Sequence, residues 1–178
     1  CELQLNKTDT YYICSECDFK ALNRNGIVFF NPEITNMHED YDSEGLEYMY
    51  KYEQKHFWFL HRKKIIAGII KKYVKNNQKI IEMGAGTGDI ARMLLTMGYT
   101  DMSVGEMHIN GLEYAKTYGI SNLYQFDILK APFVDEFDAI CMFDVLEHIE
   151  KDELALKNVA KMLKNGGRII ITVPSHKC

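Results

Sequence analysis

The sequence predicts a doubly wound α/β fold with a largely parallel sheet, on the evidence of two alternating patterns after residue 78. Short apolar runs typical of strands occur at 79–83, 102–106, 122–126, 137–143 and 168–173. Helical stretches separate most of them, at 88–97, 109–117 and 151–164. Strands that alternate with helices form parallel sheets covered on both faces, because right-handed crossovers place the helices there.

The composition is ordinary for a globular chain and excludes several functional classes. With 178 residues, 47% hydrophobic and 26% charged, the chain has room for one core and a small appendage. A net charge of −4 leaves no basic excess, so we expect no nucleic-acid partner. No apolar run approaches the ~18 residues that a bilayer requires, and we expect no membrane partner. The odd count of five cysteines favours a reducing cytoplasm over a disulfide scaffold.

Residues 1–31 form a segment of their own, with short alternating runs that predict small β-hairpins. Cys14 and Cys17 have the spacing of a zinc knuckle, and 12 residues separate Cys1 from Cys14, as in the two halves of a zinc ribbon. We therefore expect a zinc-ribbon-like segment with a structural zinc. Its fourth ligand would precede residue 1, with His38 as a substitute, and a metal-free hairpin is the alternative.

Residues 32–42 are polar and predict a linker, and the main domain is expected over 43–178. Two helices open this domain, one over Glu44 to Lys55 and a second over 57–75. In the second helix, apolar residues recur at three- and four-residue spacing, which is typical of an amphipathic helix.

A glycine-rich turn follows the strand at 79–83, with Gly84, Gly86 and Gly88 in alternate positions. Such glycines let the backbone approach a ligand at the start of a helix. A phosphate-binding P-loop would need a lysine that is absent here, and a dinucleotide loop would need its third glycine where Asp89 stands. Glu82 suits a nucleoside that carries an amine or a sulfonium group. The alternative is a tight turn without a ligand.

Two more carboxylates follow the next two strands. Glu106 ends the second strand, where an acid accepts hydrogen bonds from both hydroxyls of a ribose. Asp127 ends the third and could accept the exocyclic amine of adenine, with Phe126 or Ile128 against the ring. A helix N-cap is the alternative for Asp127. The carboxyl ends of adjacent parallel strands are where open α/β sheets bind ligands.

These residues resemble the successive motifs of class I S-adenosylmethionine-dependent methyltransferases over about residues 56–175. The motifs are Glu82-x-Gly-Ala-Gly-Thr-Gly, Glu106, Asp127, the run from Phe137 to Ile149, and the run from Leu163 to Pro174. The resemblance implies a Rossmann-like sheet, with S-adenosylmethionine as methyl donor and S-adenosylhomocysteine as product. The implied cofactor-binding residues are Glu82, Gly84, Ala85, Gly86 and Gly88 for the methionine part, Glu106 for the ribose, Asp127 and Ile128 for adenine, Phe143 and Asp144 beside the reacting methyl group, and Met107.

The segment from Glu53 to Arg62 resembles one that precedes the core in methyltransferases of small molecules, sugars and quinones. This resemblance implies methyl transfer to an O or N atom of such an acceptor. It also implies a helix over the cofactor pocket, with Trp58 and Arg62 contacting substrate or cofactor; Phe57 and Phe59 are expected in the core.

His148 is the candidate for a general base, because its pKa lies near working pH, and a structural histidine is the alternative. The competing function is a cofactor-binding but inactive module that uses the zinc ribbon for interactions. An NAD-dependent enzyme is disfavoured by Asp89.

The sheet of this family usually has seven strands, and five are predicted here. We therefore expect a piece truncated at both ends, in which Ile169 to Val173 form an unprotected edge. Pairing or swapping of two copies through that edge would give a homodimer.

Overall fold

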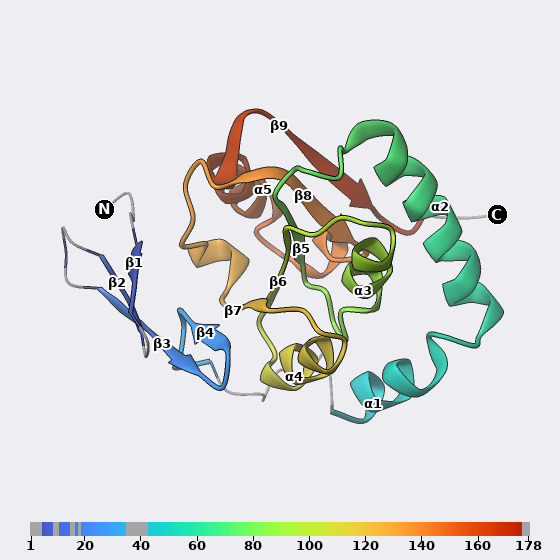
Figure 1. Ribbon diagram of the computed structural model, residues 1–178, viewed down its shortest axis with the longest axis horizontal. Helices are drawn as coiled ribbons and strands as arrows, with labels where there is room; N and C mark the ends of the chain where they lie inside the picture. The colour runs from blue at the N-terminus through green and yellow to red at the C-terminus, as the bar shows by residue number, and fades with distance from the viewer. Residues whose placement is uncertain (1–4, 9–10, 15–16, 18, 35–42, 176–178) are drawn as a thin grey trace.

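In the computed structural model, the described residues (5–8, 11–14, 17, 19–34 and 43–175) build one sheet of nine strands (Figure 1). The strand order across the sheet is β1-β2-β3-β4-β7-β6-β5-β8-β9. The strands are β1 (Leu5–Lys7), β2 (Tyr11–Cys14), β3 (Lys20–Arg24), β4 (Ile27–Phe29), β5 (Ile80–Met83), β6 (Met102–Glu106), β7 (Asn122–Gln125), β8 (Phe137–Phe143) and β9 (Leu163–Thr172).

The five strands from β5 to β9 are parallel, and β5 lies at their centre between β6 and β8. The chain leaves β5 toward β6 and β7 and later returns to its other side for β8 and β9. This reversal creates a crevice outside the carboxyl ends of β5 and its neighbours. The expectation of a doubly wound α/β core is confirmed. β9 begins earlier than expected, at Leu163, and its register against β8 shifts between Phe137 and Ala139.

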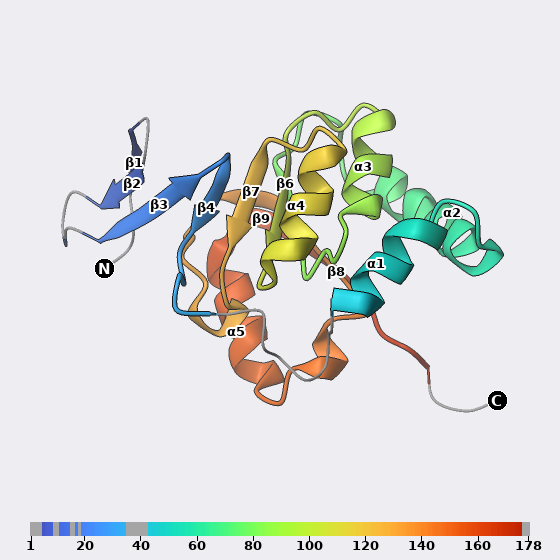
Figure 2. The same ribbon diagram turned by 90° about the horizontal axis from the view of Figure 1, so that it is seen from below.

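Helices cover both faces of the parallel strands (Figure 2). One face packs against α2, α3 and α4 through buried side chains such as Ile66, Leu94 and Leu112. The other packs against α5 through Val159 and Met162. The helices are α1 (Ser43–Tyr52), α2 (Phe57–Tyr73), α3 (Asp89–Thr96), α4 (Ile109–Thr117) and α5 (Asp152–Met162), with short 3-10 turns at η1 (Ile128–Lys130) and η2 (Leu146–His148).

The N-terminal strands extend this sheet instead of forming a separate module. β1 to β4 pair antiparallel in sequence, and β4 then lies parallel to β7, with Ile27 opposite Leu123. Val28 and Phe30 enter the same buried cluster as Phe126 and Phe137. The expected small hairpins therefore share the main core, and the fold is a mixed sheet.

The cysteines of this segment do not come together as a metal site in the described residues. Cys14 is buried and Cys17 exposed, whereas Cys1 and His38 lie outside the described residues. Within the described ranges, no group of three or more His, Cys, Asp or Glu side chains could hold a metal ion. The zinc prediction thus gains no support.

The expected linker is described only at its start, because residues 35–42 lie outside the described part. Asn31, directly before it, is buried: its N–H donates to the Gln125 side chain at 3.2 Å.

β9 is the outermost strand on its side of the described sheet, and Ile169 and Ile171 are half-buried there. That this strand is an unprotected edge, and that two copies pair through it, both stay predictions. No described helix is long and apolar enough to span a bilayer.

Candidate active site

A cavity of about 920 Å³ lies at the carboxyl ends of the parallel strands. Its size suits a nucleoside-sized ligand together with a second molecule. The cavity is lined by residues that follow the strands and by residues of the cap. The cap is the name used here for α1, α2 and the corner between them. The predicted residues that line it are Trp58, Arg62, Glu82, Gly84, Ala85, Gly86, Glu106, Met107, Asp127, Ile128, Phe143, Asp144 and His148.

The glycine loop between β5 and α3 forms the floor of this cavity. Gly86 has a left-handed φ of +55°, and among the described residues a Cβ there would meet Met49 and Leu46 of α1, at 3.7 and 3.8 Å. Gly88, also predicted to bind the cofactor, is instead buried: a Cβ there would lie 2.7 Å from that of Ala115. Gly86 thus leaves space beside the cavity, whereas Gly88 permits close packing against α4.

Glu106 is fixed by three backbone N–H groups at the end of β6. Its Oε2 accepts from Gly86 at 2.9 Å, and its Oε1 accepts from Met107 at 2.7 Å and His108 at 3.0 Å. A carboxylate has about four acceptor positions, so one more donor can be accommodated. Glu106 therefore ties the glycine loop to β6 and keeps some acceptor capacity.

Glu82 is the most unusual carboxyl in the site. It is only 3% exposed, and its Oε2 has no hydrogen-bond partner within the described part of the chain. Burial raises the pKa of Glu82 to about 8, against the opposing influence of the Arg62 guanidinium and the Ala91 backbone. A buried acceptor without a donor is unfavourable, so this position suits a ligand that brings a cationic donor.

Arg62 joins the cap to the end of β8. Its Nε donates to Asp144 Oδ2 at 2.8 Å, and its Nη2 donates to the Phe143 carbonyl at 3.1 Å. The Thr172 hydroxyl donates to Asp144 Oδ1 at 2.9 Å, so both carboxylate oxygens are engaged. The Arg62 guanidinium also lies over the Trp58 ring, at 5.6 Å from its centroid. Asp144 thus orients Arg62, a role that the motif alone does not reveal.

The aromatic residues of the cap are placed differently from the expectation. Phe57 is 68% exposed, so its assignment to the core is wrong, whereas Phe59 is half-buried and lines the cavity. The buried face of α2 runs through Lys63, Ile66 and Ile70, and Phe57 lies off this face.

His148 is exposed in η2, at the rim of the cavity. Its backbone N–H donates to the Val145 carbonyl at 3.1 Å. The exposed side chain is consistent with either role considered for it.

At the other end of the cavity, Asp127 is both an N-cap and a cavity residue. Its Oδ1 accepts from the Leu129 N–H at 2.8 Å, which caps η1. Its own N–H donates to Asn31 Oδ1 at 3.2 Å, and the Asn31 amide donates to Glu33 at 3.0 Å. The N-terminal strands therefore bring Asn31 and Glu33 to this end, which the sequence did not predict.

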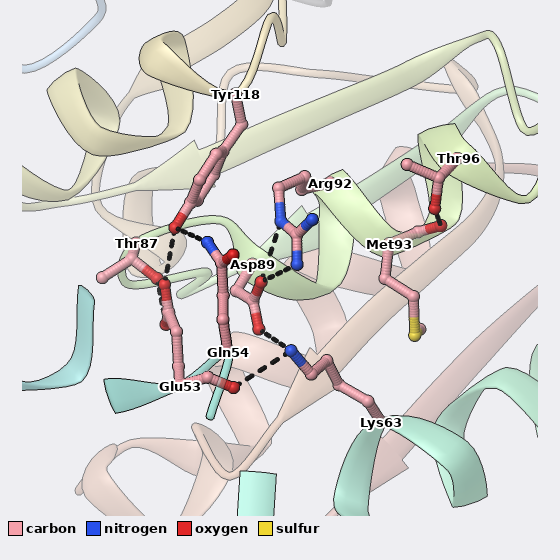
Figure 3. Close-up of polar contacts among 9 residues, drawn as sticks. All are labelled: Glu53, Gln54, Lys63, Thr87, Asp89, Arg92, Met93, Thr96 and Tyr118. Atoms are coloured by element: carbon pink, nitrogen blue, oxygen red, sulfur yellow. Dashed lines mark hydrogen bonds and ion pairs between the residues drawn. The ribbon is translucent and has the colours of Figure 1, made fainter. Parts of the chain in front are cut away.

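A second group that the sequence analysis missed lies where the cap meets the glycine loop and α3 (Figure 3). Glu53, Lys63, Thr87 and Asp89 are all buried, line the cavity and hydrogen-bond to one another. One signal could have found them: Lys63 shares the helical spacing of Ile66 and Ile70, and a lysine on a buried helix face requires an acidic partner.

Comparisons with known proteins agree with this geometry. The family model described as "Methyltransferase domain" matches residues 81–171, which is half of the chain. The ubiquinone/menaquinone biosynthesis C-methyltransferase UbiE of Sinorhizobium fredii is 27% identical over 107 residues, which cover 54% of this chain and 42% of that relative. The chain thus spans less than half the length of this curated relative.

Two solved structures show the same fold. One is a Methanococcus maripaludis protein assigned to the S-adenosyl-L-methionine-dependent methyltransferases, with a TM-score of 0.63, 21% identity, and coverage of 73% of this chain and 63% of that chain. The other is a SAM-dependent methyltransferase of Thermotoga maritima, with a TM-score of 0.55, 27% identity, and coverage of 71% and 58%. The chain belongs to the Methyltransferase domain family, and its core is an S-adenosylmethionine-dependent methyltransferase domain.

Proposed function

We propose that this protein transfers the methyl group of S-adenosylmethionine to an O or N atom of a small-molecule acceptor. The observation that carries the proposal is Glu82, a buried carboxyl whose Oε2 has no partner among the described residues, beside the glycine loop. The amino group of the cofactor's methionine part is a cationic donor and would satisfy that oxygen.

The other cavity residues supply complementary contacts for such a ligand. Glu106 would accept from one ribose hydroxyl through its remaining acceptor position, and Asp127 with Ile128 would hold the adenine. Gly84 to Gly86 would leave room for the methionine part. Arg62 would lie at the same end of the cavity, where its positive charge already lowers the pKa of the Glu82 carboxyl against the effect of burial. When bound, the cofactor supplies an electrophilic sulfonium methyl group.

The protein's own contribution is then to align an acceptor and exclude water. Trp58, Phe59 and Ile149 contribute apolar side chains to the lining of the cavity. Such side chains favour an acceptor with an aromatic or otherwise apolar part, such as a quinone, over a fully polar sugar. The name of the Sinorhizobium relative, a ubiquinone/menaquinone biosynthesis enzyme, agrees with an acceptor of this kind, but that relative is a C-methyltransferase and so does not support an O or N target atom.

His148 is the residue proposed to accept a proton from the acceptor, because it is exposed at the rim and lines the cavity. Its assignment depends on the acceptor: a hydroxyl needs its proton removed, whereas a neutral amine attacks with its lone pair.

Calorimetry with S-adenosylhomocysteine tests the cofactor. We expect micromolar binding; no heat, or preferential binding of NAD, would refute the proposal. Turnover is tested by release of S-adenosylhomocysteine from S-adenosylmethionine with a panel of quinols, sugar nucleotides and amines. Binding without turnover across the panel would favour the inactive module instead.

A further inference from the structure

Glu53 lies at the corner between α1 and α2 and is 2% exposed. Its N–H donates to the Met49 carbonyl at 2.8 Å, which continues the last turn of α1. Its carbonyl accepts from the Lys63 ammonium at 3.0 Å, and the same ammonium contacts Asp89 at 2.6 Å. The backbone of the corner is therefore held by both cap helices.

The Glu53 carboxylate reaches out of the cap to two hydroxyls (Figure 3). Thr87 donates to its Oε2 at 2.5 Å, and Tyr118 donates to its Oε1 at 2.9 Å. Gln54 in turn donates to the Tyr118 hydroxyl at 3.0 Å. Of the two hydroxyls, only that of Thr87 belongs to the glycine loop.

Two carboxylates thus accept hydrogen bonds from two successive residues of the glycine loop. Glu106 accepts from the Gly86 N–H at 2.9 Å, and Glu53 accepts from the Thr87 hydroxyl at 2.5 Å. One carboxylate comes from the sheet and the other from the cap. Leu46 and Met49 of α1 lie over Gly86, and Trp58, Phe59 and Arg62 of α2 line the cavity. The position of the cap relative to the loop therefore sets the shape of the site.

We propose that Glu53 is a positioning residue that latches the cap onto Thr87, so that cofactor affinity depends on the Glu53–Thr87 hydrogen bond. This inference rests on the proposed function, because it assigns the glycine loop to cofactor binding. It adds a residue outside the motifs at 82–88, 106 and 127.

Keeping the Glu53 carboxylate buried costs free energy, and a residue that only connected the two cap helices would not need a carboxylate. Burial raises the pKa of Glu53, and the Asp89 charge raises it further, whereas the Thr87 and Tyr118 hydroxyls and Lys63 oppose the shift. Aromatic contacts between Tyr50 and Tyr114, with ring centroids 4.3 Å apart, already attach α1 to α4. The carboxylate is therefore not required merely to keep α1 on the surface.

The test compares two variants that each remove one hydrogen bond to the same carboxylate. Thr87→Val removes the hydroxyl of the loop without changing size, and Tyr118→Phe is the matched control from outside the loop. We expect S-adenosylhomocysteine affinity to fall about tenfold in Thr87→Val and less than about twofold in Tyr118→Phe, at similar melting temperatures of the free proteins. A merely structural role predicts affinity losses that follow the melting temperatures, which would overturn the proposal.

A double-mutant cycle with Glu53→Ala separates the latch from direct contact of Thr87 with the cofactor. If Thr87 acts through Glu53, the double variant binds no more weakly than Glu53→Ala alone. Additive losses would overturn the proposal. Glu53→Gln, whose amide can still pair with both hydroxyls, should retain affinity within about threefold.

A different result would show that the proposed function is wrong, as distinct from the Glu53–Thr87 hydrogen bond being unimportant. A wild-type protein that binds no S-adenosylhomocysteine refutes the function and with it the link to cofactor affinity. Amide hydrogen exchange in α1 then tests the physical latch alone. Faster exchange in Thr87→Val and Glu53→Ala is expected, and unchanged exchange would refute the latch.

Discussion

The two ends of the cavity hold their ionisable groups in opposite ways. At the Glu82 end, Glu82, Lys63 and Asp89 are each less than a tenth exposed. At the Asp127 end, the charged pair of Glu33 and Lys130 is more than half exposed, with the ammonium 3.7 Å from the carboxylate. Charges interact strongly where water is excluded and weakly where it is not. The buried end is therefore suited to discriminate by charge, and the exposed end by shape and backbone hydrogen bonds.

The largest expected effect is at the floor of the buried end. Gly86→Val adds side-chain atoms between the loop and α1 and places a β-branched residue at a φ of +55°. We expect S-adenosylhomocysteine affinity, measured by calorimetry, to fall more than about a hundredfold, because cofactor space is filled and the backbone is strained. Gly119→Val is the control, since Gly119 has a φ of +83° and no described atom lies within 4 Å of where its Cβ would be. Binding within threefold of the wild type would contradict the assignment of the loop.

The Glu82→Gln substitution tests whether the buried end of the cavity recognises its ligand by charge. We expect about a ten- to hundredfold loss of affinity, because a charge-assisted hydrogen bond is replaced by a neutral one. The exposed Glu113→Gln variant should bind like the wild type. Equal affinities of the Glu82→Gln variant and the wild type at pH 7 would show that the buried end does not use charge.

The raised pKa of Glu82 predicts that the stability of the ligand-free protein depends on pH. The folded-state pKa of Glu82 is raised from 4.5 to about 8, so the native protein holds a proton that the unfolded chain releases between these values. The contribution of Glu82 to the free energy of unfolding therefore falls as pH rises through this window, by at most about 1.4 kcal/mol per unit. Urea unfolding across this range should show a fall that is flattened in Glu82→Gln; identical profiles would refute burial of the carboxyl.

Arg62→Met tests the link between the buried end and the cap. It keeps an apolar stem against Trp58 but removes the donors to Asp144 and Phe143. We expect about a tenfold loss of affinity and a loss of stability of about 1 kcal/mol, since the side chains of the pair are 22% and 29% exposed. Arg168→Met, at an exposed position of β9, should change neither quantity.

The smallest effect is expected at the exposed end. Asp127→Asn keeps an oxygen that can cap Leu129 and removes only the charge. We expect a loss of S-adenosylhomocysteine affinity of about two- to fivefold, with reduced discrimination against the inosine analogue, because only contact with the adenine amine is altered. A loss as large as that of Glu82→Gln would erase the distinction between the two ends.

The parts predictable from sequence are those set by local patterns. The strands and helices after residue 78 follow from periodicity, and the carboxyl-end residues Glu82, Glu106 and Asp127 follow from strand order. These carboxylates do line one cavity. Gly88 was predicted to bind the cofactor as well. A sequence motif does not distinguish a glycine that faces a ligand from one that packs against Ala115.

The remaining features depend on contacts between distant segments. The alternating runs of residues 1–31 predicted strands there, but not that β4 pairs with β7, because that pairing is a tertiary event between distant segments. Glu53 has no motif around it, and its partners Thr87 and Tyr118 meet only in the fold. The exposure of Phe57 was missed because hydrophobicity alone does not fix which face of a helix is buried.

The parallel pairing of β4 with β7 also has a consequence for the order of folding. Asn31 and Gln125, which hydrogen-bond at the end of this pairing, are 94 positions apart. Contacts of such long range form slowly, because a large loop must close before they contribute. On a ribosome, β1 to β4 are synthesised before β7 and cannot dock until β7 has been made. We infer that they wait as exposed strands during synthesis, and that they become native later than their place in the chain suggests.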